Sequence, residues 1–242
     1  MNNLPTNRQR FFSIIIPAHN EEFYIEETLR HLVLMDYPRE FFEVIVVENG
    51  SSDNTYTLAN TFADAQTHIF TIPRKGVSVA KNFGITKLHP ESEWTIFLDA
   101  DTLLEKDFLH DLNDFLMKDD NKNSVVGTTE VQPSAKSIAA KFWFTFYNLG
   151  HKLTKTSFAL QIIKTSLLAT IHFPEHLEMG EDLNLIVEAR KQGNFFYFPT
   201  KRVVTSVRRF EQEGWWKVFI HWNFVALLPQ SVQKFFHYKV VR

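Results

Sequence analysis

Short β-rich runs alternate with stretches of helical spacing in the first hundred residues, and this alternation limits the available folds more than any other feature. Between the runs lie 21–34, with apolar residues at 25, 29, 32 and 33, and 55–62, preceded by a Ser-Asp pair suited to a helix N-cap. Strands alternating with helices indicate βαβ units and a largely parallel sheet. We therefore predict an α/β fold. The four expected strands are 11–17, 43–47, 68–72 and 94–98.

A polar cluster follows each expected strand. The clusters read PAHNEE at 17–22, ENGSSD at 48–53, PRKG at 73–76 and DAD at 99–101. Ligands of open parallel sheets bind at the carboxyl ends of the strands, near a topological switch point. If the four strands are adjacent, the four clusters converge on one cleft.

The last cluster places two carboxylates, Asp99 and Asp101, one residue apart after an apolar run. Two carboxylates at such a short separation raise each other's pKa unless a cation lies between them or hydrogen bonds stabilise their charges. Carboxylate oxygens suit Mg²⁺ or Mn²⁺, so the pair indicates a divalent metal site. A solvated turn with an Asp helix cap is the alternative for an isolated D-x-D.

Composition and motif spacing exclude several other chemistries. The chain has no cysteine, which excludes disulfides, thiolate metal sites and thiol nucleophiles. A formal net charge of −2 argues against a nucleic-acid partner, which would need a basic excess. No G-x-G-x-x-G, Walker A or H-E-x-x-H motif occurs, and GVSVA at 76–80 lacks the second glycine of a nucleophile elbow.

The second half of the chain is less periodic and more aromatic. We expect a helix at 106–117, a polar loop at 118–124 and a strand at 124–129. Beyond them, aromatic residues gather at 141–147, 195–198 and 215–222. No linker, low-complexity run or repeat interrupts the sequence, so we predict one domain over 1–242.

Five motifs, in order and spacing, resemble the family 2 glycosyltransferases of the GT-A fold, over about residues 11–210. The motifs are SIIIPAHNEE at 13–22, VIVVENGSSDNT at 44–55, RKGVSVAKNFGI at 74–85, FLDADTLL at 97–104 and MGEDLNLIVEARKQG at 179–193. The resemblance implies a mostly parallel, twisted central sheet flanked by helices. It also implies a nucleotide-sugar-binding half at about 11–130 and an acceptor half at about 131–242.

The implied activity is metal-dependent, inverting transfer of a sugar from a nucleotide diphosphate, with UDP expected, to a hydroxyl of a glycan or lipid-linked acceptor. By the family's pattern Asp101 binds Mn²⁺ or Mg²⁺ directly, and Asp99 lies nearer the ribose. His19 stands where relatives often stack an aromatic ring on the nucleobase, and Glu48 stands where they place Asp. Because both positions differ from the family's pattern, the identity of the nucleobase stays open. The implied donor-binding residues are Pro17, His19, Glu21, Glu48, Arg74, Lys75, Asn82, Asp99, Ala100, Asp101, Arg208 and Arg209.

These assignments have structural alternatives. For His19 and Glu48 the alternative is a cap of a helix end or a surface group, and a lone basic pair such as Arg74 and Lys75 is usually solvated.

Inverting transfer needs a carboxylate to accept the proton of the acceptor hydroxyl. The resemblance assigns this role to Asp182, with Glu181 as the next candidate; a helix N-terminal acid favoured by the macrodipole is the alternative. SVRRF at 206–210 resembles the S-x-R-R-F element of several members, and an arginine fork suits a diphosphate, so Arg208 or Arg209 is expected to bind it. No Q-x-x-R-W motif occurs, which favours single addition over processive synthesis.

The segment 215–228 is apolar nearly all round but too short to span a bilayer as a helix. Packing in the core and lying in a membrane interface both remain open, and Lys234, Lys239 and Arg242 would favour anionic lipid. The segment 141–147 joins it or lines the acceptor pocket. The first ten residues lack the features of a signal peptide, so we expect a cytoplasmic protein at the cytoplasmic face of a membrane.

Two other functions remain to be distinguished from transfer. One is a non-catalytic GT-A subunit that binds nucleotide sugars, against which the intact Asp99, Asp101 and Asp182 argue. The other is a nucleotidyltransferase, which the E-D helix and the S-x-R-R-F element make less suitable.

Overall fold

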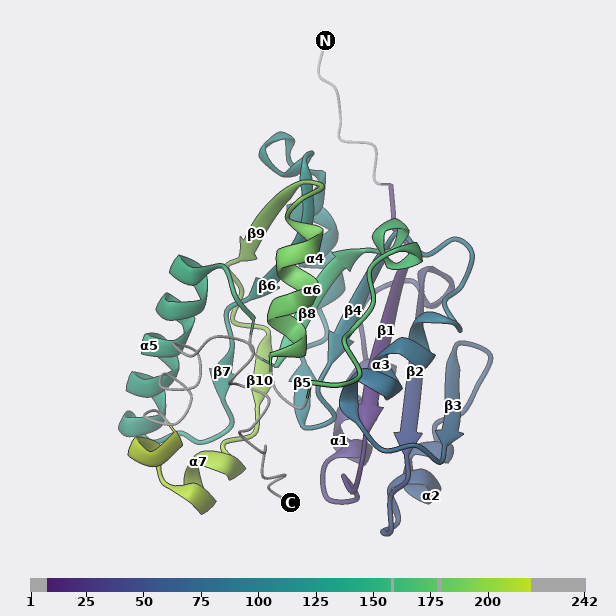
Figure 1. Cartoon of the computed structure of the whole chain (residues 1–242), viewed down its shortest axis with the longest axis vertical. Helices are drawn as coiled ribbons and strands as arrows, with labels where there is room; N and C mark the ends of the chain where they lie inside the picture. The colour runs from purple at the N-terminus through teal and green to yellow at the C-terminus, as the bar shows by residue number, and fades with distance from the viewer. Residues whose placement is uncertain (1–7, 158, 178–179, 219–242) are drawn as a thin grey trace.

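The computed structural model describes residues 8–157, 159–177 and 180–218. Its centre is a seven-stranded sheet in the order β3-β2-β1-β4-β8-β6-β9. In Figure 1, β3 lies at one side of the molecule and β9 toward the other. The strands are β1 (Phe12–Ala18), β2 (Phe42–Asn49), β3 (Thr67–Ile72), β4 (Trp94–Leu98), β6 (Ser124–Thr129), β8 (Leu160–Lys164) and β9 (Asn194–Phe198).

The sheet is mostly parallel, as predicted. β1 pairs in parallel with β2 and β4, β2 with β3, and β6 with β9, whereas β8 runs antiparallel between β4 and β6. The four strands expected in the first hundred residues are present and adjacent. Their polar clusters therefore lie side by side at the carboxyl ends of the strands.

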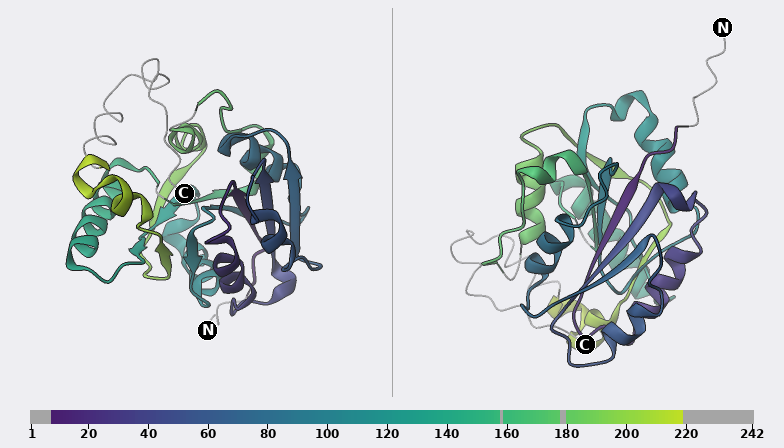
Figure 2. Two further views of the ribbon diagram at one scale, coloured as in Figure 1. Left: turned by 90° about the horizontal axis from the view of Figure 1, so that it is seen from below. Right: turned by 90° about the vertical axis from the view of Figure 1, so that its right-hand side faces the viewer.

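Helices cover both faces of the sheet (Figure 2). Alternate residues of β1 point to opposite faces, and both faces are buried. On one face, Ile14 shares a core with Leu29 and Leu112; on the other, Ile15 shares a second core with Ala80 and Leu185. The helices are α1 (Ile25–Val33), α2 (Thr55–Asn60), α3 (Val77–Ile85), α4 (Phe108–Met117), α5 (Ile138–Thr154), α6 (Glu181–Ala189) and α7 (Arg208–Glu213), with 3₁₀ turns η1 (Arg39–Phe41), η2 (Asp119–Asn121) and η3 (Thr165–Ala169).

A second, three-stranded sheet joins the end of β4 to the segment that precedes α7. Its order is β5-β10-β7, formed by Thr102–Leu104, Val203–Thr205 and Gln132–Pro133. The hydroxyls of Thr102 and Thr205 are 2.7 Å apart, and the Ser206 N–H donates to the Asp101 carbonyl at 3.1 Å. The Asp pair and the S-x-R-R-F element are therefore neighbours, although about a hundred residues separate them in the chain.

Several elements differ from the expected pattern. Helix α1 begins at Ile25 and not at 21, because the chain first forms a turn in which the N–H groups of Tyr24 and Ile25 donate to the Glu21 carbonyl. Helices α3 and α5 and strand β8 were not predicted as such.

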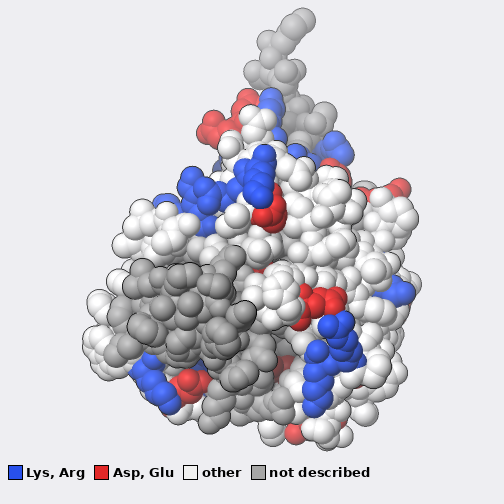
Figure 3. All heavy atoms as spheres, in the orientation of Figure 1, with Lys and Arg blue, Asp and Glu red and all other residues white. Residues whose placement is uncertain are grey.

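On the face shown in Figure 3, the described surface carries small groups of Lys and Arg beside Asp and Glu.

Two helical glycines, Gly84 in the last turn of α3 and Gly150 in α5, allow a direct test of this packing. A Cβ at Gly84 of α3 would lie 2.6 Å from Cγ2 of buried Ile15, whereas one at Gly150 of α5 would meet nothing within 4 Å. Alanine favours a helix by about 1 kcal/mol over glycine. Overpacking a core costs about 1–3 kcal/mol.

We expect Gly84→Ala to lower the free energy of unfolding and Gly150→Ala to raise it, both measured by urea denaturation. The same helix-propensity gain is present in both variants, so the opposite signs report the contact with Ile15. A Gly84→Ala protein as stable as the parent would contradict the close packing of α3 on β1.

Candidate functional site

Two clusters of charged side chains meet at the carboxyl ends of β1 and β4. The arginine cluster is Glu21, Asp101 and Arg208. The lysine cluster is Lys81, Glu181 and Asp182. Asp99 links the two clusters electrostatically, since Lys81 and Asp101 both influence its ionisation.

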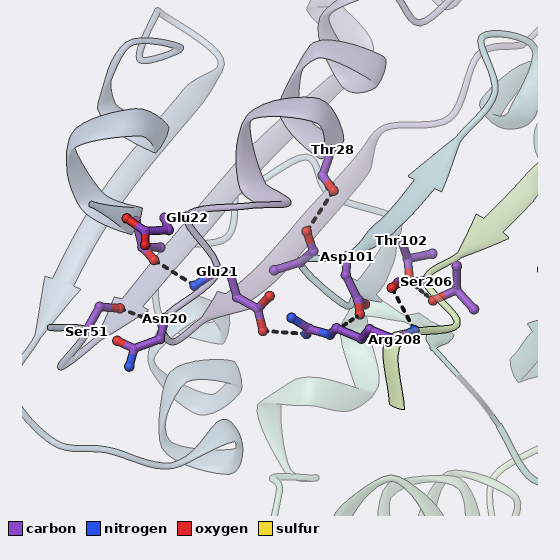
Figure 4. A network of polar contacts seen from close by, with 12 residues as sticks. Asn20, Glu21, Glu22, Thr28, Ser51, Asp101, Thr102, Ser206 and Arg208 are labelled. Atoms are coloured by element: carbon purple, nitrogen blue, oxygen red, sulfur yellow. Dashed lines mark hydrogen bonds and ion pairs between the residues drawn. The ribbon is translucent and has the colours of Figure 1, made fainter. Parts of the chain in front are cut away.

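Arg208 is the centre of the arginine cluster (Figure 4). It is the first residue of α7; its Nη2 lies 2.7 Å from Oε1 of Glu21 and its Nε lies 3.0 Å from Oδ2 of Asp101. Its guanidinium carbon also lies 4.5 Å from the centroid of the Tyr24 ring. The Thr28 hydroxyl donates to the Ala100 carbonyl at 2.7 Å and ties the turn of the Asp pair to α1. Arg208 thus joins the end of β1, the end of β4 and the start of α7.

Burial governs the ionisation of this cluster. It raises the pKa of Asp101, and the neighbouring Arg208 opposes that rise. Burial lowers the pKa of Arg208, but Glu21 and Asp101 outweigh it and hold the guanidinium charged. Within the described residues, Nη1 of Arg208 and Oε2 of Glu21 are buried without a hydrogen-bond partner. Buried polar groups are normally paired, so these two atoms mark a place for a polar ligand.

Lys81 is the centre of the lysine cluster and was missed by the sequence analysis. Its side chain is 2% exposed, and its Nζ lies 2.6 Å from Oδ1 of Asp182 and 3.3 Å from Oε1 of Glu181. Oε1 of Gln161 on β8 is 3.4 Å away, and the Phe173 ring centroid is 4.8 Å away. Lys81 lies inside the matched motif RKGVSVAKNFGI, but a lysine is usually solvated, so only its packing reveals the role.

The acids of the lysine cluster differ in access. Burial lowers the pKa of Lys81, yet Asp182, Glu181 and Asp99 raise it above its ordinary value, so Lys81 stays a cation. Burial and the neighbouring Asp182 raise the pKa of Glu181. The Asp182 side chain is 31% exposed and that of Glu181 is 11% exposed. Asp182 is therefore the acid of this pair that a ligand reaches more easily.

The two clusters together carry an excess of negative charge. Glu21, Asp99, Asp101, Glu181 and Asp182 supply five carboxylates. Lys81 and Arg208 supply two cations, and the charge of Arg209 also acts on Asp101. Burial raises the pKa of Asp99 to about 8, and Asp101 and Asp182 add to that rise. A divalent cation would supply the missing positive charge and displace the proton from Asp99.

The residues present fit such a cation. No group of three or more His, Asp or Glu side chains suited to a metal ion occurs in the described part of the chain. Mg²⁺ commonly binds through one or two carboxylates together with substrate phosphates and water. Asp99 and Asp101 match that donor set.

The other expected residues are spread around the clusters. Glu48 is buried, and its carboxylate accepts a short hydrogen bond from the Ser51 N–H at the end of β2. Asn82 exchanges two 2.9 Å hydrogen bonds with the backbone of Phe173. Arg74 forms a 2.5 Å ion pair with Glu175. The remaining ones are Pro17 within β1, His19 just after it, exposed Lys75 after β3, and Arg209, whose Nη1 lies 3.1 Å from Glu213.

Comparison with known proteins identifies the family. The model of glycosyl transferase family 2 matches residues 13–165, which is more than half of the chain. The chain belongs to glycosyltransferase family 2.

Two curated relatives are similar over most of the chain. One is the probable glycosyltransferase YdaM of Bacillus subtilis, 27% identical, with 87% of this chain and 54% of YdaM covered. The other is the poly(ribitol-phosphate) β-N-acetylglucosaminyltransferase TarS of Staphylococcus aureus, 27% identical, with 79% of this chain and 36% of TarS covered. The chain thus spans about half of one relative and about a third of the other.

Two solved structures confirm the predicted GT-A fold. S. aureus TarS 1–349 in complex with UDP-GlcNAc has a TM-score of 0.66 at 22% identity, covering 82% of this chain and 59% of that one. The mannosyltransferase PcManGT of Pyrobaculum calidifontis with GDP-Man and Mn²⁺ has a TM-score of 0.67 at 20% identity, covering 92% of this chain and 66% of PcManGT.

Replacing Lys81 tests the lysine cluster. Lys81→Met leaves buried carboxylates without their counter-charge, which costs about 3–5 kcal/mol in comparable buried pairs. The loss should be larger at pH 8 than at pH 5.5. Glu181 and Asp99 have raised pKa values, so they take up protons in the folded state as the pH falls and then need no counter-charge.

Urea denaturation at the two pH values measures the effect. The matched control is Lys87→Met, two residues beyond the same helix. This lysine is exposed and its Nζ lies 5.4 Å and 5.0 Å from the Phe70 and Phe83 ring centroids, so a change of at most about 1 kcal/mol is expected. A pH-independent loss for Lys81→Met would show that packing, and not charge, is what Lys81 contributes.

Proposed function

We propose that the chain is a catalytic domain for metal-dependent, inverting transfer of a sugar from a nucleotide diphosphate to a hydroxyl of a glycan or lipid-linked acceptor. The observation that carries the proposal is the pair of clusters at the strand ends. An arginine with a buried, unpartnered Nη1 faces two acids, and a second carboxylate pair lies beside them, held by a buried lysine.

The arginine cluster suits the donor diphosphate. Arg208 holds its charge in a low-exposure site, and its planar fork can donate paired hydrogen bonds to phosphate oxygens. Asp101 and Asp99 would hold Mn²⁺ or Mg²⁺. When bound, the ion would neutralise negative charge on the departing diphosphate. Between the two candidate arginines, Arg208 is our choice because it contacts Asp101 directly and its buried Nη1 has no hydrogen-bond partner among the described residues.

The lysine cluster suits the acceptor. Asp182 is the more exposed carboxylate of its pair, and Lys81 at 2.6 Å orients it. Asp182 would accept the proton of the acceptor hydroxyl as the oxygen attacks the sugar carbon, and Lys81 would be a positioning residue. Glu181 is more buried, with a raised pKa, and remains the next candidate for the base.

The donors and acceptors named for similar proteins support the proposed donor and acceptor classes. The TarS complex holds UDP-GlcNAc and the PcManGT complex holds GDP-Man and Mn²⁺, so both uridine and guanosine donors occur on this fold. We propose UDP because TarS is also a sequence relative. The names of TarS, a poly(ribitol-phosphate) transferase, and of the minor teichoic acid biosynthesis protein GgaB of B. subtilis make a polymer of the teichoic acid type the preferred acceptor.

The proposal includes cytoplasmic action at a membrane. No helix in the described ranges is long and apolar enough to cross a bilayer. The segment 215–228 was expected either in the core or in the interface; its described part packs Trp215 on Phe210 and buries Val218, while Trp216 is 69% exposed. Residues 219–228 lie outside the described residues, so that choice stays a prediction.

Removing a proposed metal ligand tests the donor site. Asp101→Asn should weaken UDP binding in Mn²⁺ at least tenfold, because a neutral amide replaces a charged ligand, and should leave the weak binding in chelator nearly unchanged. Titration calorimetry measures both affinities. The control is Asp119→Asn, which removes the same charge from an exposed side chain. Equal affinity of the parent for UDP in Mn²⁺ and in excess chelator would remove the metal from this site.

Replacing the proposed base separates transfer from binding. Asp182→Asn keeps the size of the side chain but cannot accept the proton, so transfer should fall about 10²–10⁴-fold while UDP affinity persists. Parental transfer by this variant would shift the assignment to Glu181, tested by Glu181→Gln. A parent that binds UDP but neither transfers sugar nor hydrolyses the donor would favour a non-catalytic subunit.

A further inference from the structure

Helix α5 has two opposite apolar faces. The inner face buries Ala140, Trp143, Phe144 and Tyr147, and the rings of Phe144 and Tyr147 lie 5.7 Å from that of Phe210 in α7. The outer face carries five large apolar side chains, exposed by 45% to 87%. We call them the α5 stripe: Ile138, Phe142, Phe146, Leu149 and Leu153.

The stripe is continuous. At about 100° per residue its five positions fall within a sector about 80° wide, opposite the buried face. Single exposed apolar residues are common on soluble proteins, but a contiguous patch marks a surface that is covered in use. In Figure 1, α5 lies at the side of the molecule away from β3.

The segment that carries the stripe has only positive charges. Residues 131–174 contain five lysines and neither Asp nor Glu. Lys136, Lys141, Lys152 and Lys155 lie on α5 or beside its ends and are exposed. Lys141 and Lys152 fall on the same side of the stripe, within about 60° of it. This lysine group stands out in a chain whose formal net charge is −2.

We propose that the α5 stripe docks the protein on a membrane surface rich in anionic phospholipid. The apolar side chains would enter the boundary between headgroups and acyl chains, and the lysines would contact the acidic headgroups. Such a helix lies in the plane of the interface and does not cross the bilayer. The proposal rests on α5 alone and is independent of the proposed transferase activity.

Other occupants fit the charge less well. Two copies meeting through this face would bring their lysines together with no acid from 131–174 to pair them. The chain's own residues 214–242 also contain no Asp or Glu, so they offer no complementary charge. A soluble polyanion would attract the lysines but leave the stripe in water.

The docking would bring the membrane close to the candidate site. The inner face of α5 packs on Phe210, two residues after Arg208. A helix is about 10 Å across, so the lipid surface would lie about one helix diameter from α7. A substrate anchored in that membrane would then start near the strand-end clusters.

Vesicle sedimentation of the full chain tests the proposal. The probes are vesicles of phosphatidylcholine alone and of phosphatidylcholine mixed equally with phosphatidylglycerol. The parent should sediment with the mixed vesicles only, and less at high salt. Phe142→Asp/Leu149→Asp should weaken the binding at least tenfold, and Lys141→Gln/Lys152→Gln about fivefold per lysine. The matched control is Val33→Asp/Leu34→Asp at the C-terminal end of α1, where both side chains are also exposed.

Each alternative has its own result. Failure of the parent to bind mixed vesicles, or equal binding by the stripe variant, overturns the proposal. A parent dimer that the stripe variant converts to monomer, seen by light scattering without vesicle binding, assigns the stripe to a second copy. A large fall in melting temperature of the stripe variant, again without vesicle binding by the parent, assigns it to residues 219–242.

Discussion

The ion pairs of Arg208 are the contact on which the rest of the site depends. They connect Glu21 after β1 with Asp101 after β4 and anchor the start of α7 to both. They are the ion pairs in this cluster that tie the second half of the chain to the proposed donor side of the sheet. The three-stranded sheet makes the contact feasible, because the pairing of β10 with β5 delivers Ser206 to the Asp101 carbonyl. The fold therefore builds the site from elements that are distant in sequence.

Charge imbalance explains why this site suits its proposed ligands. A folded protein would not normally gather five carboxylates, most of them with little exposure, around Lys81 and Arg208, because unpaired charges with little access to water are costly. A diphosphate alone would worsen the imbalance, whereas a diphosphate together with a divalent cation would not. The structural alternative considered for Asp182, an acid in the first turn of a helix, describes its place in α6; the contact with Lys81 was not foreseen.

Parts of the fold were predictable because their signals are local. The apolar runs of β1, β2 and β4 are buried on both faces, and the polar residues after them mark where they end. Helix α3 was missed because GVSVAKNFGI is rich in glycine and valine, and only packing on β1 makes it helical. Helix α5 was missed because apolar residues on two opposite faces conceal the helical period. Lys81 was missed because its partners, Glu181 and Asp182, come from another part of the chain.

The most direct test of the account is the ratio of UDP affinity to UMP affinity, measured calorimetrically in Mn²⁺ for Arg208→Gln and Arg209→Gln. UMP lacks the second phosphate, so the ratio isolates the diphosphate contact from any effect on folding or on the base. The account predicts that Arg208→Gln lowers the ratio at least tenfold and that Arg209→Gln leaves it nearly unchanged. An unchanged ratio in Arg208→Gln would contradict the account.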